Sequence, residues 1–106
     1  MTSFSTLMGN QKLLPIIQAS SVSQGLAIGE AMAAAGIHLV EVVLRTEASL
    51  DVIKALKQEL PALKVGAGTV TDADILKQAL DAGSDFIITP TISNNLLTHL
   101  SSCTVP

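Results

Sequence analysis

The chain lacks tryptophan and tyrosine, and its 106 residues include only two phenylalanines. A hydrophobic core must therefore be built from aliphatic side chains, which are plentiful because 48% of the residues are hydrophobic. Only six residues are lysine or arginine, and they are scattered along a chain with a net charge of −3. A nucleic-acid-binding surface needs a basic patch and often stacking aromatic rings, so we expect no nucleic-acid partner.

Three other features are also missing. Cys103 is the only cysteine, which excludes an intrachain disulfide. No apolar run reaches the ~18 residues of a membrane span, because Glu30, His38 and Glu41 interrupt the candidates. The amino-terminal segment lacks the basic and apolar regions of a signal peptide, and its first lysine is Lys12. We therefore expect a soluble cytoplasmic protein with no membrane partner.

Four strand-like runs alternate with four helix-like runs, after a polar lead-in of residues 1–12 that could hold a short helix. The predicted strands are 13–18, 37–44, 64–68 and 85–89, and the predicted helices are 21–35, 48–60, a segment between Thr71 and Gly83, and 93–100. The predicted helix caps are Ser21 (with Gln24 in a capping box), Thr71 and Ser93 at amino ends, and Gly36 and Gly83 at carboxyl ends.

The strands begin about two dozen residues apart, which is typical of βα units and predicts a parallel sheet with helices outside it. Two architectures fit this pattern: a doubly wound open sheet and a (β/α)8 TIM barrel, which usually needs ~250 residues. Four units make half of such a barrel, and residues 103–106 look like the opening of a fifth strand. We therefore expect one incomplete domain over residues 1–106, the amino-terminal half of a barrel.

The second predicted strand carries two opposite charges, Glu41 and Arg45, among valines and leucines. In a strand, Glu41, Val43 and Arg45 share one face, and about 13 Å separates the Cα atoms of the two charged residues. They cannot easily pair directly, and buried charges cost several kcal/mol each unless they are paired or solvated. The pattern therefore predicts a polar site along this face, which we expect to be the barrel interior and to hold Val43 and Ala67 beside the two charges.

A Gly-x-Gly sequence, Gly66 to Gly68, lies between the third strand and the third helix. It is an incomplete nucleotide-binding motif, because Thr71 stands where a third glycine is needed and no Gly-Lys-Ser/Thr follows. Glycines at a strand end can instead admit a close backbone or ligand. The two histidines lack metal-ligand spacing. We therefore predict neither a metal nor a cofactor.

Several short motifs resemble the class I 2-keto-3-deoxy-6-phosphogluconate (KDPG) / 4-hydroxy-2-oxoglutarate (KHG) aldolases. They are Glu-Val-Val-Leu-Arg-Thr-Glu at 41–47, Val-Gly-Ala-Gly-Thr-Val at 65–70, Ile-Thr-Pro at 88–90 and Leu-Pro-Ile-Ile at 14–17. The resemblance covers nearly the whole chain. It implies a (β/α)8 barrel, a homotrimer, and an enzyme that forms a Schiff base between a lysine and the ketone of pyruvate.

The resemblance also implies roles for four residues. Glu41 matches the general acid/base of the carbinolamine and enamine steps, Arg45 and Thr69 match residues that hold the pyruvyl carboxylate, and Pro90 matches a pocket residue. The family's Schiff-base lysine lies on strand six, beyond residue 106, so the isolated chain is expected to be inactive as an aldolase.

Three alternatives stay open. Where the family often has Ser-Pro-Gly, this chain has Thr-Pro-Thr at 89–91, which is more similar to the 2-keto-3-deoxy-6-phosphogalactonate aldolases. Another phosphate-handling barrel enzyme, such as an isomerase, would share the fold. A non-catalytic half-barrel that assembles with itself or with a partner is the alternative from a different class.

Overall fold

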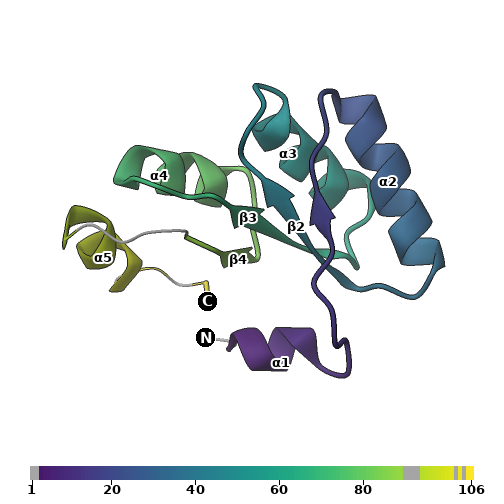
Figure 1. Cartoon of the computed structure of the whole chain (residues 1–106), viewed down its shortest axis with the longest axis horizontal. Coiled ribbons are helices and arrows are strands. Elements are labelled where there is room, and N and C mark those ends of the chain that lie inside the picture. Colours follow the sequence, from purple (N-terminus) through teal and green to yellow (C-terminus); the bar gives the residue numbers. More distant parts are fainter. Residues whose placement is uncertain (1–2, 90–93, 102, 104) are drawn as a thin grey trace.

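A computed structural model describes residues 3–89, 94–101, 103 and 105–106 (Figure 1). The four predicted βα units are present, and the lead-in contains a short helix. In chain order the elements are α1 (Phe4–Met8), β1 (Ile16–Ile17), α2 (Val22–Ala34), β2 (Leu39–Val43), α3 (Ser49–Glu59), β3 (Lys64–Gly68), α4 (Ala73–Asp81), β4 (Phe86–Ile87) and α5 (Asn94–Ser101). Within the described residues, no helix is both long and apolar enough to cross a membrane.

The four strands form one sheet in the order β1-β2-β3-β4, and every neighbouring pair is parallel, as predicted. Figure 1 shows α2, α3 and α4 on one side of the sheet and α1 on the other. The register aligns two adjacent rows across the sheet: Ile16, Glu41, Gly66 and Phe86 in one, and Ile17, Val42, Ala67 and Ile87 in the next. Because side chains alternate along a strand, these two rows face opposite sides.

One face of the sheet packs against α3 and α4 and forms the main hydrophobic core. The buried strand members of this core are Ile17, Val40, Val42, Val65 and Ala67, and those of the two helices are Val52, Ile53, Leu56, Leu76 and Ala79. The core is aliphatic, as the composition predicts. Ala67 was expected on the opposite face with Val43, and this was wrong, because the register pairs Ala67 with Val42.

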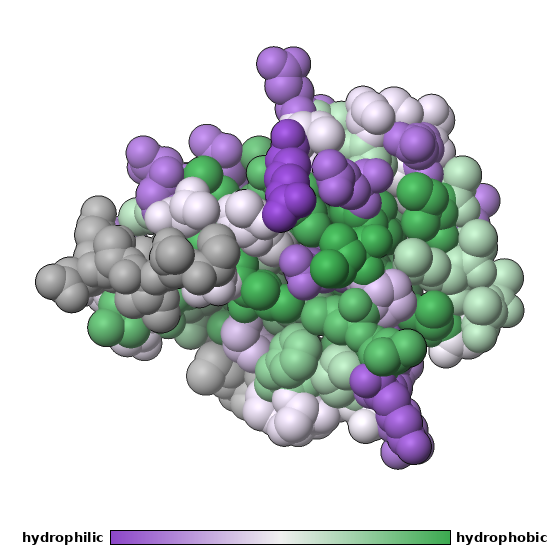
Figure 2. Space-filling view, viewed as in Figure 1, coloured by the Kyte–Doolittle hydropathy of each residue, from purple (hydrophilic) through white to green (hydrophobic). Residues whose placement is uncertain are grey.

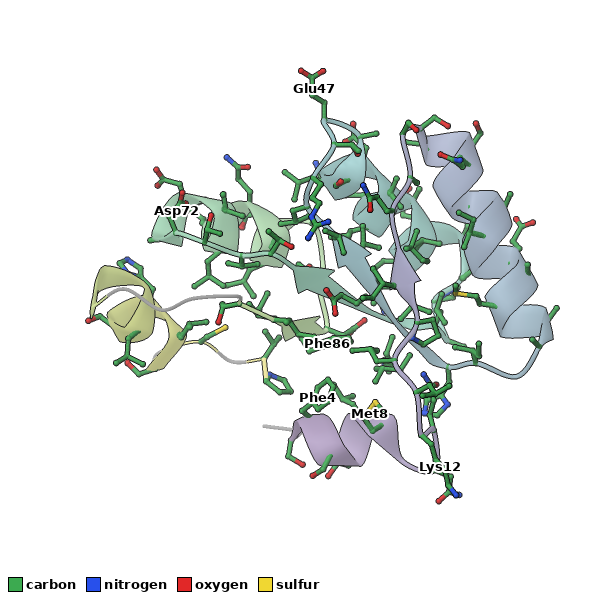
Figure 3. All side chains as sticks on the ribbon, in the orientation of Figure 1. Phe4, Met8, Lys12, Glu47, Asp72 and Phe86 are labelled. Carbon is green, nitrogen blue, oxygen red and sulfur yellow. The ribbon has the colours of Figure 1, made fainter. Side chains whose placement is uncertain are left out.

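The opposite face, which we call the open face, carries Leu39, Glu41 and Val43 from β2. Its lower part is covered by α1: Phe4 meets the fully buried Phe86 with ring centroids 5.2 Å apart. Figure 3 shows Phe4 and Met8 pointing from α1 toward the sheet. The remainder stays uncovered, and Figure 2 shows hydrophobic surface across the middle of the molecule with hydrophilic side chains along its upper border.

Three of the predicted helix caps are confirmed: Ser21, Gly36 and Gly83. Ser21 accepts a hydrogen bond from the Gln24 amide at 3.2 Å, and Gly36 and Gly83 have φ values of 89° and 97°, in the left-handed region that favours glycine. The prediction for Thr71 was wrong, because Asp72 caps α4 by accepting from the Ile75 amide at 2.8 Å. A carboxylate is the stronger acceptor at the positive end of a helix. Ser93 lies outside the described residues.

The outer strands are shorter than predicted. β1 has two residues instead of six because the Gln11 side chain occupies the start of β2 in its place. Its amide oxygen accepts from the backbone of His38 and Leu39, both at 3.1 Å, and its nitrogen donates to the Leu39 carbonyl at 2.7 Å. The Gln11 side chain therefore makes the hydrogen bonds to the start of β2 that a longer β1 would make. Leu13, which was predicted to begin the strand, is 79% exposed.

Candidate active site

Glu41 lies in the middle of β2 on the open face, and its side chain is only 8% exposed. Within the described residues, no hydrogen bond or ion pair reaches its carboxylate, whose oxygens keep some contact with solvent. Burial disfavours the charged form and raises the pKa of Glu41 above its ordinary value of 4.5. A carboxyl group with a raised pKa and no ion-pair partner is suited to accept and return a proton.

Gly68, on the neighbouring strand, makes room for this carboxylate. A Cβ atom at Gly68 would collide with the Glu41 carboxylate, and a Cβ at Gly66 would collide with the ring of Phe86. The Gly-x-Gly sequence therefore admits two side chains of neighbouring strands.

Arg45 lies beyond the end of β2, which stops at Val43. Its amide donates to the Val43 carbonyl at 2.9 Å, and this tight turn ends the strand alternation that was predicted to continue through Arg45. The arginine side chain is exposed. Among the described residues, no salt bridge joins it to Glu41.

Thr69 directly follows β3 and has a φ of 63°, the only positive φ of a non-glycine residue among those described. A β-branched residue in this region is strained, and such strain clusters at functional sites. The Leu44 amide donates to the Gly68 carbonyl at 3.0 Å, so the residues directly before Arg45 and Thr69 are bonded to each other. The structure therefore brings Arg45 and Thr69 together at the carboxyl end of the sheet, above Glu41.

Of the four residues predicted for the site, Pro90 lies outside the described residues. The chain before it is placed: Ile88 donates to Ala67 at 2.9 Å and accepts from Val70 at 3.2 Å. Glu47 is exposed and points away from the molecule in Figure 3.

Two hydroxyl residues next to Arg45, Thr46 and Ser49, were not singled out from the sequence. The Thr46 amide donates to the Ser49 hydroxyl, and the two hydroxyl oxygens lie within hydrogen-bonding distance of each other. The Thr46 hydroxyl donates to the Ala19 carbonyl of the preceding βα unit. The Thr-x-x-Ser spacing resembles an ordinary helix start, so only the long-range bond to Ala19 distinguishes it.

The lysines lie away from these strand ends. Three sit on helix surfaces or in the lead-in, and Lys57 is held by Asp85 at 2.8 Å. Lys64 alternates onto the open face with Gly66, but it begins β3 and so lies at the amino end of the strand. No lysine in the described part of the chain is at a strand's carboxyl end. The five are Lys12, Lys54, Lys57, Lys64 and Lys77.

Three of the cavities lie outside the site. These cavities, which are among those formed by the described residues, have volumes of about 420, 340 and 340 Å³, and none of the three is lined by Glu41, Arg45 or Thr69. The 420 Å³ cavity lies at the amino ends of the strands, beside His38 and Pro61. Ligand sites of parallel α/β folds lie at the carboxyl ends, so the strand-end cluster has more weight than cavity size. No cluster of three potential metal ligands occurs within the part of the chain that is described.

Comparison with known proteins gives consistent matches. The family model for KDPG and KHG aldolases matches residues 5–106. The 2-dehydro-3-deoxy-phosphogluconate aldolase of Pseudoalteromonas atlantica is 42% identical over 85 residues, which cover 80% of this chain and 40% of that protein. The KHG/KDPG aldolase of Escherichia coli strain K12 is 32% identical over 105 residues, which cover 99% of this chain and 49% of the relative. The chain thus spans about half the length of the curated relatives it matches.

Solved structures agree. A KDPG aldolase from Legionella pneumophila, with pyruvate captured as a covalent carbinolamine, superposes with a TM-score of 0.92 at 28% identity and covers 99% of this chain and 51% of its own. The aldolase from Zymomonas mobilis gives a TM-score of 0.80 at 36% identity, over 87% and 44% of the two chains. The four βα units therefore match about half of the aldolase barrel rather than a doubly wound sheet, and the chain belongs to the KDPG and KHG aldolase family.

Proposed function

We propose that residues 1–106 supply the acid/base and carboxylate-binding side of a class I aldolase site. The enzyme would cleave 2-keto-3-deoxy-6-phosphogluconate or 4-hydroxy-2-oxoglutarate to pyruvate and an aldehyde. The observation that carries this proposal is the largely buried side chain of Glu41, whose carboxyl group has no hydrogen-bonding partner among the described residues, below the strand ends that bear Arg45 and Thr69.

Each residue has a distinct part in the proposed chemistry. Glu41 gives a proton to the carbinolamine hydroxyl as it leaves as water, and it exchanges protons with the substrate when the carbon–carbon bond breaks and the enamine is protonated. Arg45 can hold the pyruvyl carboxylate through two parallel hydrogen bonds. Thr69 adds a hydroxyl from the adjoining strand end. Pro90, the fourth predicted residue, is proposed as a pocket wall.

The Schiff-base lysine is proposed to come from a segment outside residues 1–106. The positions of the five lysines support this, because a nucleophile must share the strand-end site with Glu41. The Legionella protein, which forms a carbinolamine with pyruvate, is about twice as long as the matched region.

The gluconate-type or 4-hydroxy-2-oxoglutarate substrate is proposed over the galactonate type. The named relatives at 31–42% identity are KHG/KDPG or phosphogluconate aldolases. The KDPGal structure is only 24% identical, a likeness that supports the fold alone. Membership in the aldolase family likewise favours cleavage over an isomerase reaction. A homotrimer and a cytoplasmic location complete the proposal, on the family resemblance and the composition.

The test is a fusion, which we call the completed barrel: residues 1–106 joined to the part of the Legionella aldolase that the match leaves uncovered. Borohydride reduction in the presence of pyruvate should add one pyruvyl group to the completed barrel and none to the 106-residue chain. Peptide mass mapping identifies the lysine. A stoichiometric adduct on any of the five lysines of the chain, with Lys64 the first to inspect, would show that the nucleophile has been misplaced.

A further inference from the structure

The loop that carries Arg45 lies outside regular secondary structure, yet its backbone is fixed at three successive amides. Those of Leu44 and Arg45 donate to the Gly68 and Val43 carbonyls at 3.0 and 2.9 Å. The next amide, that of Thr46, donates to a side-chain hydroxyl at 3.2 Å. Hydrogen bonds therefore fix the backbone that carries Arg45, while its side chain is exposed.

The hydroxyl in question belongs to Ser49, which is only 2% exposed. Ser49 donates to the Val43 carbonyl at 3.0 Å, and Thr46 donates to the Ala19 carbonyl at 2.8 Å. The two hydroxyl oxygens are 3.0 Å apart. Each has a single proton, so a hydrogen bond between them would have to replace one of the carbonyl bonds. The pair thus fastens the β2–α3 loop to the end of β2 and to the loop after β1.

Helix-start hydrogen bonding explains only part of this arrangement, namely the bond from the Ser49 amide to the Thr46 carbonyl at 3.2 Å and the bond from the Thr46 amide to the Ser49 hydroxyl. The N-cap of α3 is Ala48, which has no side-chain capping bond. Thr46 and Ser49 are hydroxyl residues close enough in sequence to cap the helix, but their oxygens bond to strand and loop backbone instead. These hydrogen bonds hold the backbone on both sides of Arg45, at Val43 before it and at Thr46 after it.

We propose that Thr46 and Ser49 are positioning residues for Arg45, which hold the β2–α3 loop against Ala19 so that the guanidinium is presented to the substrate carboxylate. This rests on the proposed role of Arg45 as carboxylate ligand. A preorganised loop reduces the ordering cost of binding and leaves proton transfer at Glu41 unchanged. The effect should therefore appear in KM, with little change in kcat.

The kinetic test uses the exchange of pyruvate methyl protons with deuterium oxide, catalysed by the completed barrel. Thr46→Val, which removes the hydroxyl at nearly constant shape, should raise KM for pyruvate about 3- to 10-fold, as expected for one lost hydrogen bond. Thr46→Ser keeps the hydroxyl and should restore the wild-type KM. Thr71→Val makes the same change on an exposed threonine of the next βα loop and should have no effect.

A double-mutant cycle separates positioning from general loosening. If Thr46 acts through Arg45, Thr46→Val should have no further effect on KM once Arg45→Ala is present. Fully additive effects would overturn the proposal. If Arg45→Ala itself leaves KM unchanged, the carboxylate role of Arg45, and hence the proposed function, is wrong in that respect.

Hydrogen exchange on the 106-residue chain tests, independently of catalysis, whether Thr46 and Ser49 hold the β2–α3 loop. Peptides spanning residues 43–49 should exchange faster in Thr46→Val than in the wild type or Thr46→Ser, with no change in peptides from α4. Unchanged exchange over residues 43–49 would overturn the proposal that the Thr46 hydroxyl holds this loop, even if the completed barrel were an active aldolase.

Discussion

At the scale of single residues, the carboxyl group of Glu41 is held where its charge is costly. It is buried, its pKa is raised by desolvation, and among the described residues it has no hydrogen-bonding partner that would offset the cost. A residue chosen for stability would not be ionisable here. If Glu41 has the proposed role, the open face gives up folding free energy to hold a proton-transfer group, which is the usual relation between an active site and its fold.

Glu41→Gln is expected to lower activity and raise stability at the same time. In the completed barrel, kcat should fall by ~10²–10⁴ because glutamine cannot transfer the proton. The raised pKa means that the Glu41 carboxyl binds its proton more tightly in the folded state than in the unfolded state. The ionised Glu41 therefore destabilises the wild-type fold, an effect that is absent below pH 4.5 and grows as the pH rises through the raised pKa. Thermal unfolding of the 106-residue chain should therefore show a higher midpoint for the variant at pH 8 and an equal midpoint at pH 3.5.

Glu47→Gln is the control, because Glu47 is exposed and points away from the site (Figure 3). It should change neither kcat nor the pH dependence of unfolding. Near-normal turnover in Glu41→Gln would reject the acid/base assignment.

The two glycines of β3 should respond differently to alanine. At Gly68 the new methyl group meets the flexible end of Glu41, which can move aside, so stability should change little while kcat of the completed barrel falls at least tenfold. At Gly66 it meets the Phe86 ring, which is fully buried, so Gly66→Ala should lower the free energy of unfolding by about 1–3 kcal/mol. Urea unfolding and initial rates distinguish the two, and equal losses of stability would contradict this explanation of Gly68.

At the scale of helices and strands, local pattern sufficed for most of the fold. Hydrophobic runs and helix-ending glycines predicted four parallel βα units, and the structure has them. Two features were missed because they depend on residues far apart in sequence. Gln11 shortens β1 by bonding to β2 across 28 positions, and Thr46 reaches Ala19 across 27. No local periodicity contains such information.

The site shows the same division. Motif resemblance selected Glu41, Arg45 and Thr69, and the structure places Arg45 and Thr69 just beyond the carboxyl ends of adjacent strands, with Glu41 in the middle of β2. Strand alternation predicted the face of Glu41 correctly, but it failed for Arg45, because one turn at Val43 ended the strand. It also failed for Ala67, because the sequence does not fix the register between strands.

Gln11→Leu should show how much one side chain contributes at the element scale. The change leaves the His38 amide and Leu39 backbone groups without their partner, so the chain should lose about 1–3 kcal/mol of stability. Hydrogen exchange at His38 and Leu39 should accelerate with it. Gln58→Leu alters an exposed glutamine of α3 and serves as the control. Equal stability of the two variants would mean that solvent replaces the Gln11 bonds without cost.

At the scale of the whole molecule, the sheet is covered fully on one face only. Parallel sheets are normally buried on both faces. Here the edge strand β1 leaves Ile16 59% exposed on the open face, and Leu13 just before it is 79% exposed. At the other edge, the Ile87 amide of β4 donates to the Pro106 carbonyl at 2.8 Å, so the last residue of the chain lies beside the sheet. The 106-residue chain is therefore expected to self-associate or aggregate.

Ile16→Lys is predicted to have opposite effects in the chain and in the completed barrel. In the 106-residue chain, a charge on the exposed edge should weaken self-association about tenfold or more, measured by sedimentation. In the completed barrel the same side chain becomes interior, so the variant should unfold at lower temperature. Leu97→Lys changes another exposed apolar residue, 50% exposed on α5, and should leave self-association unchanged. A wild-type chain that stays monomeric and unfolds cooperatively would mean that four βα units are sufficient to protect this sheet, and that the open face needs no second half.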